Sequence, residues 1–151
     1  MEKQLTDDQL ATLPPLTQRL ILSVRSAGLR VDHRELFPDG EIVIPAASSE
    51  VGDLVIEADE EITLFVGHHT HGHFTPAPMS AGTDQEHNDH TIDMFLTYLR
   101  DILADQVVIW SLNENGRQRS GGTFGIEAMP SQAPAGADAW LWSGRRYEPV
   151  P

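Results

Sequence analysis

Residues 83–104, with the sequence TDQEHNDHTIDMFLTYLRDILA, form the stretch that decides the fold. Apolar side chains recur in it every three or four positions, which is the spacing that gives an α-helix one apolar face. These side chains are Ile92, Phe95, Leu96, Leu99, Ile102 and Leu103. Thr83 and Glu86 have the spacing of a capping box, so the helix is predicted to begin at residue 84. A helix with such a face is expected to cover a sheet.

The sequence before this helix begins with a predicted helical segment, residues 1–28. Thr6 is placed to cap a short turn, which a pair of prolines then interrupts. Apolar residues at helical spacing predict a packing helix near 15–27. Its basic residues, Arg19 and Arg25, are expected to lie in solvent.

Residues 29–76 predict a meander of strands. A strand is expected at 41–44, and the apolar runs at 53–57 and 62–66 flank a four-residue connection in the manner of a β-hairpin. If the last of these strands continues past Gly67, it runs into a group of histidines.

Residues 106–143, after the central helix, also predict strands. A strand from residue 106 leads into a hairpin turn at 113–116. A Gly-Gly pair at 121–122 is expected to break the returning strand, and a strand at 139–143 completes the set.

Together these elements predict a single α+β domain, residues 1–151, whose last segment, 144–151, is a tail. A mostly antiparallel sheet of about six strands packs against two main helices. A chain of 151 residues with 40% apolar side chains is large enough to close a hydrophobic core.

The composition excludes several classes of protein. The chain has no cysteine, so it has no disulfides, no thiolate nucleophile and no cysteine-ligated zinc. The acidic amino terminus lacks the apolar core of a secretory signal, and no apolar run approaches the length of a membrane span. The expected setting is therefore the cytoplasm, without a membrane partner.

Acidic side chains are concentrated in the middle of the chain. The net formal charge is −13, and residues 32–105 hold 16 acidic side chains against only Arg34 and Arg100. Such a segment repels nucleic acids and anionic lipids, and it attracts cations or a basic protein. The alternative is that the charge only keeps the protein in solution. On the first interpretation, the candidate binding residues are those of the hairpin connection, Asp59, Glu60 and Glu61.

A cluster of histidines is the other chemically informative feature. Four of the seven histidines lie within residues 68–73. If residues 68–74 are extended, His69, His71 and His73 share one face of a strand, and two of them can lean onto one metal ion. The alternatives are a solvent-facing row with His68 or Phe74 inward, and a pH-responsive patch.

Two further histidines, His87 and His90, belong to the predicted helix at 83–104. One of them, together with the strand histidines, would complete a zinc site with an open position for water. Glu86 or Asp89 would then be the candidate general base. The alternative function is therefore a metal-binding protein or a metal-dependent hydrolase, with zinc as its cofactor.

A short segment resembles a known enzyme family. Residues 69–76, HTHGHFTP, are similar to the signature of the histidine-triad nucleotide hydrolases and transferases. The resemblance implies that a histidine of the triad attacks an α-phosphate. That family has apolar residues between its histidines, whereas this chain has Thr70 and Gly72.

A broader resemblance covers residues 41–143. The succession EITLFVG at 61–67, THGHF at 70–74, VVIW at 107–110 and WSG at 142–144 is similar to small uncharacterised bacterial proteins, some of which resemble toxin-immunity proteins. The resemblance implies an α+β domain whose activity is binding. The preferred prediction is therefore a non-enzymatic domain that binds a basic protein partner, as an immunity-type inhibitor binds a basic toxin.

Overall fold

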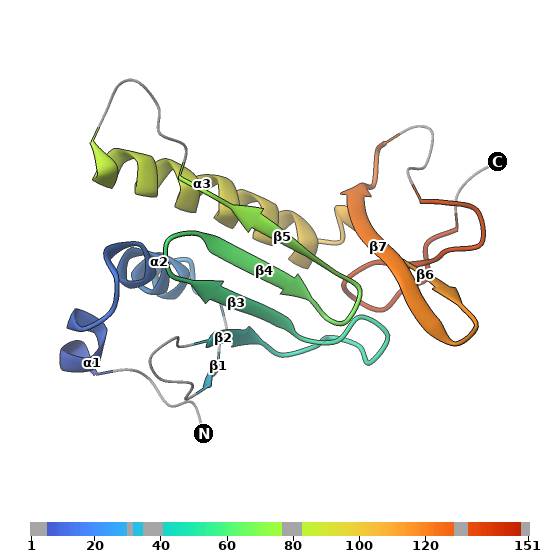
Figure 1. Ribbon diagram of the computed structural model, residues 1–151, viewed down its shortest axis with the longest axis horizontal. Coiled ribbons are helices and arrows are strands. Elements are labelled where there is room, and N and C mark those ends of the chain that lie inside the picture. Colours follow the sequence, from blue (N-terminus) through green and yellow to red (C-terminus); the bar gives the residue numbers. More distant parts are fainter. Residues whose placement is uncertain (1–5, 30–31, 35–40, 77–82, 129–132, 149–151) are drawn as a thin grey trace.

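The computed structural model describes residues 6–29, 32–34, 41–76, 83–128 and 133–148. Within them the chain forms three helices and eight strands (Figure 1). In chain order these are α1 (Asp7–Ala11), α2 (Pro15–Ser26), β1 (Asp32–Arg34), β2 (Glu41–Ile44), β3 (Leu54–Ala58), β4 (Ile62–Val66), β5 (Thr70–Phe74), α3 (Asp84–Leu103), β6 (Val107–Glu114), β7 (Arg117–Gly125) and β8 (Asp138–Trp140).

The strands form two antiparallel sheets. The first has five strands in the order β1-β2-β3-β4-β5, and the second has three in the order β7-β6-β8. The predicted α+β class with antiparallel strands is confirmed. The described strands number eight rather than about six, and they are divided between two sheets rather than joined in one.

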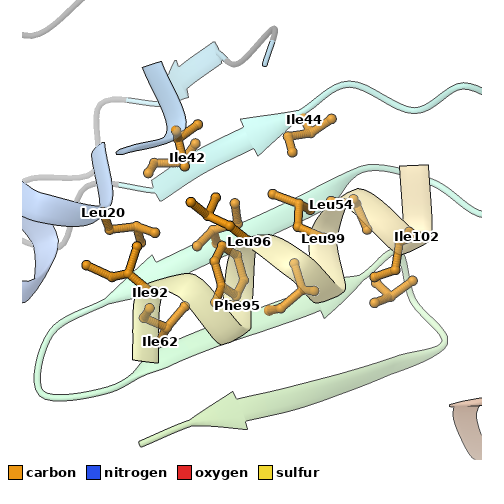
Figure 2. Close-up of a cluster of buried hydrophobic side chains, with 14 of the residues drawn as sticks. Leu20, Ile42, Ile44, Leu54, Ile62, Ile92, Phe95, Leu96, Leu99 and Ile102 are labelled. Atoms are coloured by element: carbon orange, nitrogen blue, oxygen red, sulfur yellow. The ribbon is translucent and has the colours of Figure 1, made fainter. Parts of the chain in front are cut away.

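Helices α2 and α3 cover one face of the five-stranded sheet, which we call the inner face. Phe95, Leu99 and Ile102 of α3 are fully buried in one cluster with Leu54 and Ile62 of the sheet (Figure 2). Alternate residues of a strand point to opposite faces. The burial of β4 alternates accordingly, since its first, third and fifth residues are buried and the two between them are not.

The other face of this sheet, the outer face, carries the residues between those core positions. The strand registers place Val55, Phe65 and His71 in one row across β3, β4 and β5. Glu57, Thr63 and His73 form the neighbouring row. These six residues are half-buried or exposed. The sequence alternation of β3 to β5 thus separates an apolar inner face from an outer face that carries polar and aromatic groups.

The helix boundaries follow from the predicted local signals. Thr6 caps α1, where its hydroxyl accepts a hydrogen bond from the Gln9 amide. The Gln9 side-chain oxygen in turn accepts a hydrogen bond from the Thr6 backbone N–H. Pro15 is the first residue of α2. The amide at this position has no hydrogen-bond partner within the helix, so proline loses no helical hydrogen bond there. The Thr83 hydroxyl accepts a hydrogen bond from the Glu86 amide at 3.2 Å at the start of α3. The three predicted helix starts are therefore confirmed.

The β4–β5 connection is a tight turn and not a continuing strand. The chain turns at residues 67–69 and returns as β5, the edge strand of the first sheet. Gly67 has a φ of +53°, and a Cβ built on it would lie 1.7 Å from the Val51 carbonyl oxygen. Only glycine fits this position, so the adjoining β2–β3 and β4–β5 loops can pack against each other.

The predicted break of β7 at the Gly-Gly pair is wrong. β7 runs without interruption from Arg117 to Gly125 and pairs with β6 throughout, with one irregularity beside Leu112. The glycines are needed for close packing instead. A Cβ on Gly121 would lie 1.8 Å from the His69 carbonyl oxygen, and one on Gly122 would lie 2.8 Å from the Trp110 ring.

The second sheet is attached to the end of the first sheet that carries the β2–β3 and β4–β5 loops, which we call the loop end. The Gln118 side chain donates a hydrogen bond to the His69 carbonyl at 2.5 Å. The hydroxyls of Tyr98 in α3 and Thr123 in β7 are also 2.5 Å apart, and burial raises the pKa of Tyr98. Val107, Ile109 and Trp142 share one buried cluster with the first sheet. The loop end is therefore covered, whereas the β3–β4 hairpin points away from the second sheet (Figure 1).

Replacement of Leu99 by alanine should destabilise the fold. The side chain is 0% exposed between α3 and the sheet, so its loss should lower the free energy of unfolding by about 2–5 kcal/mol. Met94 of the same helix is 54% exposed, and Met94→Ala should change that free energy by less than about 0.5 kcal/mol. Urea unfolding followed by circular dichroism measures both. Equal losses in the two variants would contradict the assigned inner face.

Replacement of Gly121 by alanine should loosen the junction between the sheets. The new methyl group collides with backbone of the β4–β5 turn, so a loss of roughly 1–3 kcal/mol is expected. Gly125 lies in the same strand with nothing within 4 Å of its Cβ position, and Gly125→Ala should be neutral or slightly stabilising. Thermal unfolding compares the two variants. A Gly121→Ala protein as stable as Gly125→Ala would contradict the observed contact.

Candidate functional site

The candidate binding residues Asp59, Glu60 and Glu61 form the tip of the β3–β4 hairpin. Ala58 pairs with Ile62, so the connection has these three residues rather than four. Asp59 and Glu60 are exposed, and Glu61 is half-buried. The tip lies at the same end of the molecule as the start of α3 (Figure 1).

Two open depressions flank the hairpin tip. The first has a volume of about 500 Å³ and is lined by Glu57, Asp59, Glu60 and Glu61 together with Ala58, Thr63 and Thr75. The second, of about 660 Å³, lies toward the α2 and α3 starts. Asp59, Glu60 and Thr75 line both depressions. The two exposed carboxylates therefore stand on the ridge between two concave surfaces.

The charges around the tip are poorly compensated. Residues 54–66, which form the hairpin, contain four acidic side chains and neither lysine nor arginine. Among the residues that the structure describes, neither Asp59 nor Glu60 forms an ion pair. Asp84, at the start of α3, lines the second depression and adds a further carboxylate. This end of the molecule therefore carries a concentrated negative field.

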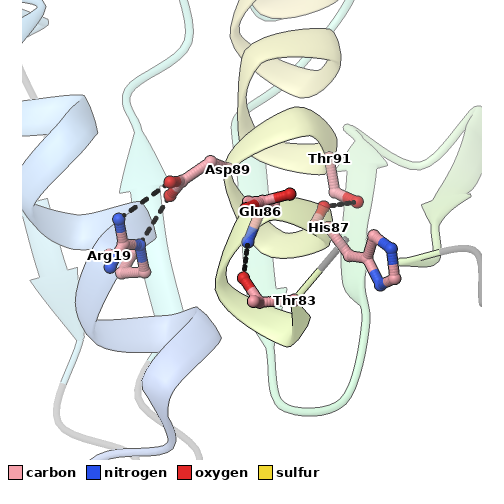
Figure 3. Close-up of polar contacts among 6 residues, drawn as sticks. All are labelled: Arg19, Thr83, Glu86, His87, Asp89 and Thr91. Atoms are coloured by element: carbon pink, nitrogen blue, oxygen red, sulfur yellow. Dashed lines mark hydrogen bonds and ion pairs between the residues drawn. The ribbon is translucent and has the colours of Figure 1, made fainter. Parts of the chain in front are cut away.

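Arg19 supplies positive charge near this end, but it is already paired. Its guanidinium donates two hydrogen bonds to Asp89 of α3, with Nε–Oδ1 2.6 Å and Nη2–Oδ2 2.9 Å (Figure 3). The expectation that Arg19 lies in solvent is therefore wrong, because this fork of donors joins α2 to α3. The same pair occupies the carboxylate of Asp89, one of the two candidate general bases.

Glu61 takes part in a local network with β5. Its Oε1 lies 2.8 Å from Nδ1 of His73, and its Oε2 accepts a hydrogen bond from the Thr75 hydroxyl at 2.9 Å. The Thr63 hydroxyl lies 3.2 Å from the same His73 nitrogen. Glu61 therefore differs from Asp59 and Glu60, because both of its oxygens have partners.

This network does not have the arrangement of a catalytic triad. In a triad the hydroxyl nucleophile and the carboxylate contact different nitrogens of the histidine, so that a proton passes through the ring. Here Thr63 and Glu61 both face Nδ1 of His73. The hydroxyl of Thr63 is therefore not activated in that way.

The structure brings together two of the three predicted strand histidines. His71 and His73 lie side by side on the outer face of β5, with ring centres 5.2 Å apart. Phe74, the last residue of β5, points inward, and its ring centre lies 5.3 Å from that of Phe95. Of the alternatives for the inward residue, Phe74 is the one observed, while His68 is exposed.

His69 lies apart from this pair because the strand begins only at Thr70. Its ring packs on Trp140 of β8 with centres 5.0 Å apart, and its Nε2 lies 2.7 Å from the Glu50 carbonyl oxygen. Its own carbonyl is the group that Gln118 contacts. His69 therefore belongs to the junction between the two sheets.

The helix histidines lie on the far side of the sheet from His71 and His73. α3 packs on the inner face, whereas the two strand histidines occupy outer-face positions. Within α3 the His87 carbonyl accepts a hydrogen bond from the Thr91 hydroxyl at 2.9 Å (Figure 3). His90 is exposed. Across the described part of the chain, no three His, Asp or Glu side chains converge on a point where a metal ion fits.

Sequence reasoning missed two of these contacts. The Arg19–Asp89 pair joins residues that are far apart in the sequence, so no local sequence pattern predicts it. The Glu61–His73 contact depends on the register of β4 and β5, which places His73 opposite Thr63. A turn at 67–69, signalled by Gly67, would have predicted that register.

Comparisons with known proteins add no evidence on the fold or on the site, which are therefore argued from the geometry. No protein family, curated protein or solved structure matches the chain. Within the described residues, no helix has the length and apolar character needed to cross a membrane. The resemblance to immunity-like proteins therefore remains a prediction from the sequence.

Proposed function

We propose that this chain is a non-enzymatic binding domain whose acidic hairpin tip docks on a basic protein, as an immunity-type inhibitor docks on a basic toxin. The observation that carries the proposal is the position of Asp59 and Glu60 on an exposed ridge between two depressions. Carboxylates presented in this way can contact the cationic side chains of a partner from both sides of the ridge.

The shape of this end suits a protein partner. The two depressions share a rim and together offer a broad, open surface rather than one enclosed pocket. The second depression adds the exposed apolar side chains of Pro14 and Pro15 beside the carboxylates. Interfaces combine such apolar area with a polar rim, so this end provides both kinds of contact.

The charge distribution differs between the hairpin and the second sheet. The β3–β4 hairpin, residues 54–66, holds four acidic side chains and no basic one. Residues 107–148, which include the second sheet, hold four acidic and four basic side chains. A basic partner is therefore attracted to the hairpin in preference to the second sheet. Steering of this type raises the association rate more than it raises the lifetime of the complex.

The test compares two charge-matched variants. Asp59→Asn with Glu60→Gln removes two carboxylates from the ridge, and Glu127→Gln with Glu148→Gln removes two exposed carboxylates outside the hairpin. A basic protein captured on the immobilised chain is identified and its association measured at several salt concentrations. The ridge variant should associate roughly three- to tenfold more slowly at low salt, and this difference should vanish at high salt.

The control variant should associate at nearly the wild-type rate. Growth of cells that produce the basic partner should be restored by the wild-type chain and less well by the ridge variant. Failure to capture any basic protein, or equal association rates for both variants, would contradict the proposal.

A further inference from the structure

His71 and His73 have the spacing of two imidazoles that share a metal ion. Their ring centres are 5.2 Å apart on the same face of the edge strand. Two imidazoles bound to one tetrahedral ion at ~2.0–2.1 Å per bond have ring centres about 5 Å apart. The rings meet edge to face, with their planes 88° apart, and the separation of their centres is compatible with a common ion.

Glu61 prepares one of these rings for metal binding. An ionised carboxylate only accepts hydrogen bonds, so the contact of Oε1 with Nδ1 places the proton of neutral His73 on Nδ1. The lone pair is then on Nε2, the nitrogen that does not face Glu61. Metal-binding histidines commonly have a carboxylate partner of this kind, because it fixes the tautomer and the orientation of the ring.

His71 completes the pair. It is exposed, and no residue in the described portion of the chain forms a hydrogen bond or ion pair with its ring nitrogens. Its ring also contacts Phe65 with centres 5.7 Å apart, which restricts its orientation on the outer face. A nitrogen of His71 is thus accessible to an ion beside His73.

The donor set determines which ion fits. Imidazole nitrogens favour Cu²⁺, Ni²⁺ and Zn²⁺ over Ca²⁺ and Mg²⁺, which prefer oxygen ligands, and Cu²⁺ binds most strongly in this series. Glu57, in the same row as His73, adds negative charge to this face. The nearby field therefore favours a divalent cation.

We propose that His71 and His73 chelate a divalent transition-metal ion, with Glu61 as the positioning residue for His73. The chain supplies two ligands, and water fills the other coordination positions. This site differs from the predicted zinc centre, since it uses neither His69 nor the helix histidines. It does not depend on the proposed binding of a basic protein.

The test is a titration of the tag-free protein with Cu²⁺. Calorimetry measures the affinity, and electron paramagnetic resonance identifies the coordinated nitrogens. The spectrum of the wild-type complex should show two coordinated imidazole nitrogens. His71→Asn and His73→Asn should each lower the Cu²⁺ affinity at least about tenfold and leave one such nitrogen. The controls His68→Asn and His90→Asn, which alter exposed histidines outside the pair, should bind as the wild type does.

Glu61 is tested by two substitutions. Glu61→Ala should lower the Cu²⁺ affinity about tenfold, whereas Glu61→Gln, whose amide oxygen can still accept a hydrogen bond from Nδ1–H, should retain most of it. Circular dichroism and thermal unfolding establish that each variant is folded. Unchanged affinity in His71→Asn and His73→Asn, equal losses in the controls, or a single coordinated nitrogen in the wild type would overturn the proposal.

Discussion

The packing of α3 against the five-stranded sheet is the contact on which the other features depend. Phe95, Leu99 and Ile102 are buried against the inner face, and this burial fixes which residues of each strand point inward. A shift of one residue in any register would expose the apolar side chains and bury the polar ones. The outer positions of Glu57, Thr63, His71 and His73 follow from this constraint.

The second sheet gives the molecule two unlike ends. It covers the turn at 67–69 through a close contact that requires glycine at position 121, and glycine at position 67 lets the loop at 45–53 pack against the same turn. The other end keeps the hairpin tip and the start of α3 uncovered by the second sheet (Figure 1). The carboxylates are therefore concentrated where no other part of the described fold neutralises Asp59 and Glu60, while Glu61 is committed to the His73 network.

Much of the fold could be predicted because its signals are local. The apolar stripe of α3, the caps at Thr6 and Thr83, and the Asn115-Gly116 turn all act within a few residues, and each is present in the structure. The continuity of β7 could not be predicted, since glycine in a strand indicates a break unless the close neighbours are known. The hairpin tip followed from two strand patterns, but the packing of His69 on Trp140 required knowledge of the second sheet.

We propose the hairpin end as the docking surface. Hydrogen–deuterium exchange of the chain, free and bound to its captured basic partner, tests it most directly. The account predicts slower exchange at residues 57–63 and in the first turn of α3, with little change in β6 and β7. Slowing confined to the second sheet, with unchanged exchange at residues 57–63, would contradict the account.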